Sequence, residues 1–335
     1  MSPDVFSTLL DPVVLFFLLG LFAAFVRSNL EMPAQISKFI SLYLLMAIGI
    51  KGGVALSVSG IQPQILTGLG IALLMAFLVP AYTYPILRLR TDGYNAAAVA
   101  ATYGSVSAVT FIAAGQYLDN QGVPHGGYMA VALVIMEAPA VIMAVSLAAI
   151  TRAAEAKKSK LSQDIHPATH SSGHFSIKGV LHESFTDGAI VLLMGSLVIG
   201  YIVGTDGYAV MKPFTGDLFK GLLAFFLLEM GMLVGRRVRE MRGIDPFFVA
   251  FALVIPVLNA LVTLALASWA GLPDGDTLML AVLAASASYI VVPAVVRAAI
   301  PEANPGIYFT MALAMTFPFN VIIGIPLYFQ LLSIF

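Results

Sequence analysis

The chain has 335 residues, of which 59% are hydrophobic and only 10% are charged, and its formal net charge is −1. Soluble domains average roughly 45–50% apolar and roughly 25% charged residues, so this composition excludes an ordinary soluble protein. The chain offers no polybasic surface for nucleic acid. It has no cysteine, which excludes disulfides and thiolate-based catalytic or metal sites.

Long apolar runs make up most of the chain. A helix needs about 20 mostly apolar residues to cross the bilayer, and the hydrophobic residues suffice for about ten such helices. The runs are continuous, whereas a β-barrel would show short alternating segments. We therefore expect an all-α polytopic membrane protein with ten transmembrane helices. In chain order, the predicted spans are 12–27, 36–58, 65–87, 94–116, 127–151, 187–204, 215–236, 246–271, 276–299 and 306–333. The first is expected to be a retained span, because no Lys or Arg precedes it as in a signal peptide.

The longest polar interval, 152–184, predicts an exposed linker between two halves of five spans. We expect a first repeat over 11–152, a linker over 153–186 and a second repeat over 187–335. Because five is odd, the second half must enter the membrane from the opposite side, which makes the repeat inverted. Four pairs of similar positions support this repeat: 45–53 with 227–235, 100–107 with 281–288, Pro80 with Pro256, and 137–139 with 316–318.

Basic residues predict the orientation of the spans. Of the 17 Lys and Arg residues, most lie in the loops that follow odd-numbered spans, including the linker. Short cytoplasmic loops are enriched in Lys and Arg. We therefore expect the linker in the cytoplasm and both termini outside.

The spans 94–116 and 276–299 are rich in small residues at matching positions of the two halves. Tight helix packing is one interpretation. The other is that both helices break at mid-membrane, which exposes N–H groups suited to an anion and carbonyl groups suited to a cation. Occurrence in both halves favours the breaks. The predicted site for a small monovalent anion comprises Gly104, Ser105, Val106, Ser107, Ser286, Ala287 and Ser288.

Three ionisable residues, Lys51, Glu137 and Glu229, lie deep in apolar runs. Such residues are costly in the membrane and should pair or line a cavity. Glu137 is interpreted as an acid that helps to bind a cation or proton, with a structural carboxylate as the alternative. Lys51 and Glu229 either form a buried salt bridge or modulate the charge near the anion. The predicted cation site comprises Thr102, Ser107, Glu137 and Ser288.

Metal and enzyme chemistry receive little support from the sequence. His166, His170 and His174 repeat every four residues, but Pro167 and Gly173 make a metal-binding helix improbable there. No metal other than sodium is expected. The chain has no GxSxG, HExxH or Walker A motif, so we expect no enzyme activity.

Four stretches resemble the cyanobacterial-type sodium-dependent bicarbonate transporter family. They are 48–53, 104–107, 280–288, which reads LAVLAASAS, and 299–305, which reads AIPEANP. The resemblance covers essentially all spans in order. It implies bicarbonate import driven by sodium, discontinuous helices four and nine in a five-plus-five inverted repeat, and a location in the bacterial inner (plasma) membrane. It also implies a homotrimer, an elevator-like motion of a core against a scaffold, and a cytoplasmic PII-like regulator.

By motif position, the resemblance places the bicarbonate and sodium sites on the residues of the two predicted breaks, with Glu137 where the family has an acid. Two positions depart from the family pattern. Tyr289 stands where the family has an acid, and Lys51 stands where it has a small polar residue. Sodium, a proton or Lys51 could therefore supply the coupling charge. The alternatives are a cation-coupled carrier of another small carboxylate or monovalent anion, an anion channel, and a nucleotide-responsive membrane receptor.

Overall fold

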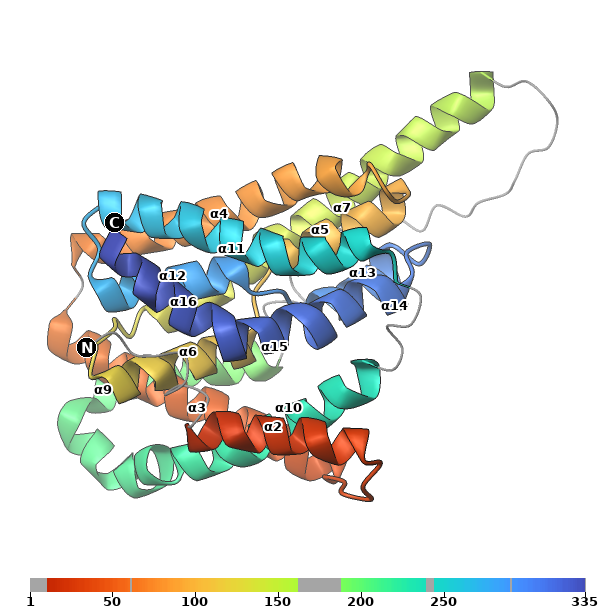
Figure 1. The fold of residues 1–335 in the computed structure, drawn as a ribbon. Helices are drawn as coiled ribbons and strands as arrows, with labels where there is room; N and C mark the ends of the chain where they lie inside the picture. Colours follow the sequence, from red (N-terminus) through yellow and green to blue (C-terminus); the bar gives the residue numbers. More distant parts are fainter. Residues whose placement is uncertain (1–10, 61, 162–187, 239–243, 290, 335) are drawn as a thin grey trace.

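A computed structural model describes residues 11–60, 62–161, 188–238, 244–289 and 291–334. Within these ranges the regular elements are helices (Figure 1). In chain order they are α2 (Pro12–Phe25), α3 (Ala34–Ser59), α4 (Pro63–Leu87), α5 (Gly93–Gly104), α6 (Ala108–Gln121), α7 (Met129–Leu161), α9 (Gly188–Lys212), η1 (Pro213–Asp217), α10 (Phe219–Val238), α11 (Pro246–Trp269), α12 (Asp274–Ala285) and α13 (Val291–Ala299). A last helical stretch comprises α14 (Pro305–Thr310), η3 (Met311–Thr316), α15 (Phe317–Phe319), η4 (Asn320–Gly324), α16 (Ile325–Leu331) and η5 (Leu332–Ile334).

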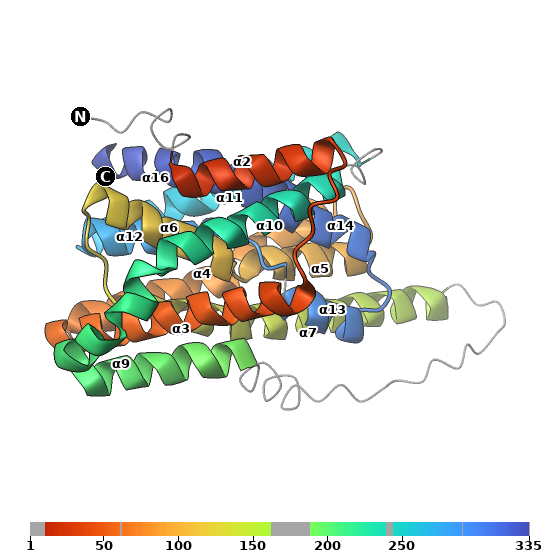
Figure 2. The same ribbon diagram turned by 90° about the horizontal axis from the view of Figure 1, so that it is seen from below.

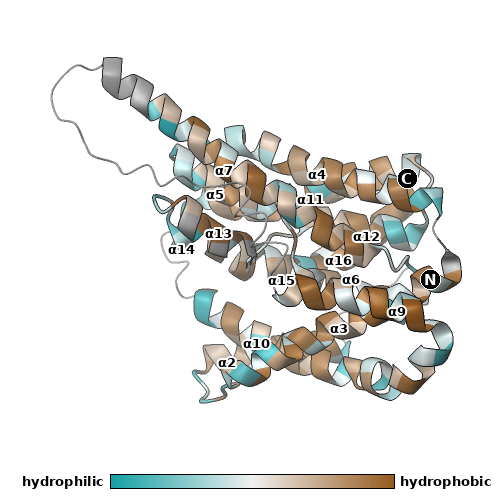
Figure 3. Cartoon of the chain, turned by 180° about the vertical axis from the view of Figure 1, so that it is seen from behind, coloured by the Kyte–Doolittle hydropathy of each residue, from teal (hydrophilic) through white to brown (hydrophobic). Residues whose placement is uncertain are grey.

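Seven helical stretches of the described chain are long and apolar enough to cross a membrane. Figure 3 shows hydrophobic residues along the helices and hydrophilic residues mainly toward their ends. The chain is therefore a polytopic helical membrane protein. Ten spans remain a prediction, for three reasons visible in the structure. One stretch, Gly188–Val238, is interrupted at Gly204, which has φ 58°; α2 has only 14 residues; and α12 and α13 are each shorter than a span.

Aspartate side chains mark the starts of several helices. Asp11 caps α2, Asp92 caps α5 and Asp245 caps α11, each by accepting a hydrogen bond from a backbone N–H of the first turn. Partial burial alone would raise the pKa of Asp92, but hydrogen bonds from Asn95 and Tyr94 outweigh it and lower the pKa. The caps therefore fix the points at which the chain enters these helices.

The helices form two groups. The four-helix group consists of α2, α3, α9 and α10, and the core group consists of α4 to α7 and α11 to α16. In the four-helix group α2 packs along α10 and α3 packs along α9 (Figure 2). In the core group α5 packs against α4 and α7, while α12 packs against α11 and α6. Figure 1 shows the four-helix group along one side of the molecule.

Glycines let the paired helices of the four-helix group touch through their backbones. Gly49 and Gly53 on α3 face the backbone of α9, and Gly231 on α10 faces the backbone of α2. Gly20 and Gly200 meet the partner backbone from the other helix of each pair. A Cβ at any of these positions would collide with main-chain atoms. Such small-residue contacts are the usual means of close packing between membrane helices.

The two ends of the bundle are named by the groups that lie there. We call one end the arginine face; there Arg152 pairs with Glu302 at 2.9 Å and Arg236 approaches Glu31 at 3.7 Å. The other end, the termini face, contains the start of α2 at Asp11 and the start of α12. The predicted linker falls largely within 162–187, outside the described residues.

Candidate functional site

Two helices of the core group stop inside the bundle. Ser105 and Ser286 end α5 and α12, and both have extended backbone, with φ/ψ of −97°/−175° and −82°/170°. An extended residue cannot continue the hydrogen bonds of a helix, so each helix is interrupted there. The chain resumes helical geometry at α6 and α13. The interruptions include the predicted serines of both spans.

The two interruptions are hydrogen-bonded to each other. The N–H of Ser288 donates to the carbonyl of Thr102 at 2.9 Å, and the N–H of Ser107 donates to the Ser286 hydroxyl at 2.9 Å. The Ser286 hydroxyl in turn donates to the carbonyl of Leu283 at 2.8 Å. The four segments α5, α6, α12 and α13 therefore meet at one junction, which we call the serine junction.

Serine side chains also cap the half-helices that leave the serine junction. The Ser107 hydroxyl accepts a hydrogen bond from the N–H of Thr110 at 3.2 Å. The Ser288 hydroxyl accepts one from the N–H of Val292 at 3.3 Å. Serine is among the preferred N-cap residues because its oxygen satisfies a free N–H of the first turn. The positive ends of two helix dipoles thus point toward the junction, as an anion requires.

Two hydroxyls at the serine junction have no hydrogen-bond partner within the described part of the chain. They are Ser105 Oγ and Thr110 Oγ1, and the residues are 1% and 0% exposed. Buried polar atoms are nearly always hydrogen-bonded, so these two are the groups that a bound ion could satisfy. Sequence reasoning missed Thr110. Its position three residues after the capping Ser107 was the signal that could have found it.

The remaining predicted residues of the breaks are buried around the junction. Val106 is 2% exposed and Ala287 is 3% exposed. Thr102 is fully buried, and its hydroxyl donates to the carbonyl of Ala98 within its own helix at 2.8 Å. Gly104 has a packing role, because a Cβ there would lie 2.5 Å from Cγ of Pro80 on α4. Tight packing and helix interruption therefore occur together in this segment.

Glu137 and Tyr289, two residues singled out from the sequence, are both buried. Glu137, 6% exposed, lies on α7, which packs against α5, α12 and α13. Tyr289, also 6% exposed, lies in the second interruption, directly after Ser288. Its hydroxyl approaches Met230 Sδ at 3.9 Å, so this side chain reaches from the core group to α10 of the four-helix group. A phenol at this position has no negative charge to offer a cation.

Lys51 and Glu229 do not pair with each other. Lys51 Nζ lies 4.0 Å from an Asp119 carboxylate oxygen, whereas Glu229 accepts a hydrogen bond from the Ser37 hydroxyl. Ser37 and Lys51 both lie on α3, fourteen residues apart, which separates them by about 21 Å along the helix axis. The alternative of a Lys51–Glu229 salt bridge was therefore wrong: each residue has its own partner at a different depth.

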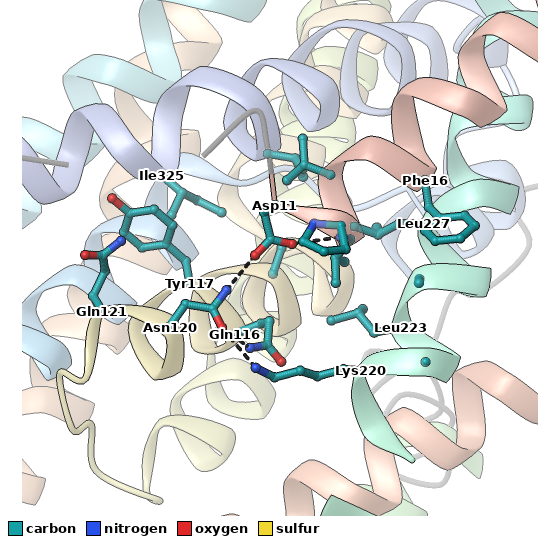
Figure 4. A pocket seen from close by; sticks show the side chains of 17 residues that line it. Asp11, Phe16, Gln116, Tyr117, Asn120, Gln121, Lys220, Leu223, Leu227 and Ile325 are labelled. Atoms are coloured by element: carbon teal, nitrogen blue, oxygen red, sulfur yellow. Dashed lines mark hydrogen bonds between the residues drawn. The ribbon is translucent and has the colours of Figure 1, made fainter. Parts of the chain in front are cut away.

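Two cavities lie along adjoining faces of α6, and neither is lined by the serines of the junction. The larger, of about 600 Å³, lies between α2, α6, α10 and η4 (Figure 4). At its polar end, Asn120 donates to Asp11 at 2.6 Å and Lys220 donates to Asn120 at 3.1 Å. The smaller, of about 350 Å³, is lined by Lys51 and is called the Lys51 cavity below. Gln116 lines both.

The three linker histidines and most of the linker fall outside the described residues.

The family model of the Na⁺-dependent bicarbonate transporter superfamily matches residues 12–333 of the chain. No curated protein matches the chain. The matched range includes both interruptions, both cavities except for Asp11, and nearly all of the described helices.

Proposed function

The chain belongs to the Na⁺-dependent bicarbonate transporter superfamily, which is a family of transporters and not of enzymes, and we propose that it imports bicarbonate with sodium by an elevator-like alternating-access mechanism. The observation that carries this proposal is the serine junction. It combines two capped half-helix N-termini with two unpartnered buried hydroxyls, those of Ser105 and Thr110. These groups can donate hydrogen bonds to a small anion. The site therefore needs no positively charged side chain.

The sodium ion is proposed to bind beside the anion. The oxygens offered are those of Thr102, Ser107, Glu137 and Ser288, and the carbonyls at the ends of α5 and α12 add neutral ligands. Unwound carbonyls and half-helix C-termini are the groups that coordinate sodium in other transporters with broken helices. Sodium is the coupling ion in this proposal, and no other cofactor is required.

An inverted repeat of 11–152 and 187–335 is part of the proposal, and matched geometry supports it. Helices α5 and α12 each have 12 residues and end in serines with similar backbone angles. The glycines Gly49 and Gly53 occupy the positions that Gly231 and Gly235 occupy in the second half. Exchanging the halves turns the pair α2–α10 into the pair α9–α3, and these are the two closely packed pairs of the four-helix group.

The movement is proposed to occur between the two helix groups. Backbone contacts at glycines make the four-helix group a rigid scaffold, while the core group carries the serine junction. The arginine face is proposed to be cytoplasmic and both termini to lie outside the bacterial inner membrane, because Lys and Arg concentrate in that set of loops. A homotrimer in the lipid bilayer and a cytoplasmic PII-like regulator complete the proposal from the family resemblance.

A cation-coupled carrier of another small carboxylate is the second candidate, favoured by one observation. Tyr289 lies in the second interruption where the family resemblance implies an acid, and its buried phenol contacts a methionine sulfur. A site without that carboxylate holds sodium less strongly. Coupling to sodium or to a proton then becomes the measurable difference between the two candidates.

Uptake of labelled bicarbonate into proteoliposomes, with and without a sodium gradient, tests the proposal. We expect saturable uptake that the sodium gradient stimulates. Ser107→Leu and Ser288→Leu should each abolish uptake, because leucine fills the junction and removes a cap. Ser333→Leu, an exposed serine at the end of the chain, is the matched control and should transport normally. Normal uptake by both junction variants would refute the site.

A further inference from the structure

The Lys51 cavity lies between the two helix groups on the side of the termini face. Lys51 comes from α3 of the four-helix group, whereas Gln116, Asp119 and His125 come from α6 and the turn that follows it in the core group. The cavity, of about 350 Å³, falls at the small end of the range for small-molecule sites. It is therefore a space shared by the scaffold and the core, distinct from the serine junction.

The polar groups of this cavity are incompletely satisfied. Lys51 Nζ lies 4.0 Å from Asp119 Oδ2, at the outer limit of an ion pair, and 4.7 Å from the centre of the Phe219 ring. The side chains of Lys51 and Asp119 are 36% and 50% exposed, so this pair holds its members weakly. His125 Nδ1 is buried and has no hydrogen-bond partner among the residues that the structure describes. The cavity thus offers a cationic donor and an anionic acceptor together, and its lining includes His125.

We propose that the Lys51 cavity is a capture site for an oxyanion that carries a hydroxyl, which is bicarbonate if the proposed function holds. The ammonium of Lys51 binds the charged oxygens of the anion. Its hydroxyl donates to the Asp119 carboxylate, whose side chain is 50% exposed. An anion without a hydroxyl, such as nitrate, gives this acceptor no donor and meets the charge of Asp119 without compensation. The site therefore selects by hydrogen-bonding pattern as well as by charge.

The position of the cavity indicates where a captured anion goes next. Its inner end is lined by Phe111 and Ile112 of α6 and Met279 of α12, which are 5%, 4% and 0% exposed. The N–H of Phe111 donates to the carbonyl of Ser107 at 3.0 Å. One helical turn, about 5.4 Å, therefore separates this apolar floor from the serine junction. The capture site is one apolar layer away from the proposed transport site.

Kinetics of labelled bicarbonate uptake in proteoliposomes test the capture site. We expect Lys51→Gln to raise KM about tenfold, as loss of a charged hydrogen bond does, while the maximal rate stays within about twofold. Lys51→Arg should retain a KM near that of the unaltered protein. Lys220→Gln is the matched control, because this lysine lies at the same end of the bundle but lines the larger cavity. Its KM should not change.

The outcomes separate the capture site from the proposed function. A normal KM for Lys51→Gln, with Ser107→Leu inactive, refutes the capture site and leaves the function standing. No uptake by the unaltered protein refutes the function. In that case labelling with trinitrobenzenesulfonate still tests the site: bicarbonate, but not nitrate, should slow modification of Lys51 relative to Lys220. If bicarbonate leaves the rate of Lys51 modification relative to that of Lys220 unchanged, the proposal is overturned.

Discussion

Ser105 and Ser286 occupy matching positions at the serine junction but differ in their hydrogen bonds, which makes them a sharp test of the site. Ser105 Oγ has no partner in the described chain and is 1% exposed. Ser286 Oγ accepts from the N–H of Ser107 and donates to the carbonyl of Leu283. One hydroxyl therefore makes no hydrogen bond within the described chain, whereas the other already stabilises the fold.

Replacing each serine by alanine should separate these roles. Ser105→Ala removes a hydroxyl that no described protein group binds, so the ion-free protein should be no less stable. Ser286→Ala leaves the buried N–H of Ser107 without its acceptor, which costs about 1–3 kcal/mol, while the carbonyl of Leu283 keeps its bond from the backbone N–H of residue 286. With the ion bound the order changes: Ser105→Ala loses a charge-assisted hydrogen bond of about 1.5–3 kcal/mol, which lowers affinity roughly ten- to a hundredfold.

Thermal unfolding of the purified protein, with bicarbonate and sodium varied, measures both effects. The ion-free melting temperature of Ser105→Ala should equal or exceed that of the unaltered protein, and Ser286→Ala should melt at a lower temperature. Because a ligand stabilises the folded state according to its affinity, the upward shift with bicarbonate should be much smaller for Ser105→Ala. A destabilised ion-free Ser105→Ala that keeps a full bicarbonate shift would refute the reasoning.

Three further substitutions have expected outcomes that differ in size. Gly231→Leu places a side chain against the backbone of α2 at Phe17 and should prevent stable assembly of the helices. Size-exclusion chromatography should then show no monodisperse peak, and a normal peak would contradict the packing. Asn259→Leu removes a fully buried amide that donates to the carbonyl of Ala284 and should lower the free energy of unfolding by about 1–3 kcal/mol in denaturant titration, and an unchanged midpoint would count against it. Arg152→Gln breaks a half-exposed pair with Glu302 and should change the free energy of unfolding by less than about 1 kcal/mol, so a larger loss would show that the pair is more than a surface contact.

Composition and apolar run length sufficed to predict a polytopic helical membrane protein, and the resemblance in the serine segments identified the family. Both predictions are confirmed. They succeeded because span length and turn-forming residues are local properties of the chain. The serines at 105, 107, 286 and 288 could be singled out for the same reason: their alternation with small residues recurs at matching places in the two halves.

The partners of the charged residues could not be predicted in the same way. Lys51 and Glu229 lie near corresponding places of the repeat, which favoured a pair, yet Lys51 approaches Asp119 and Glu229 accepts from Ser37. Pairing depends on the depth and rotation at which two helices meet. Depth and rotation are set by backbone contacts at glycines such as Gly53. The sequence does not show which helix such a glycine packs against.

The hydrogen bonds that join the two interruptions have a consequence for leakage. Because Ser288 donates to Thr102 and Ser107 donates to Ser286, neither half-helix can swing aside alone without leaving buried polar atoms unpaired. A proton or chloride that leaked between the half-helices without transport would have to break both hydrogen bonds together. In the proposed transporter, the serine junction that binds the ions therefore also keeps the two half-helices together when no ion is bound.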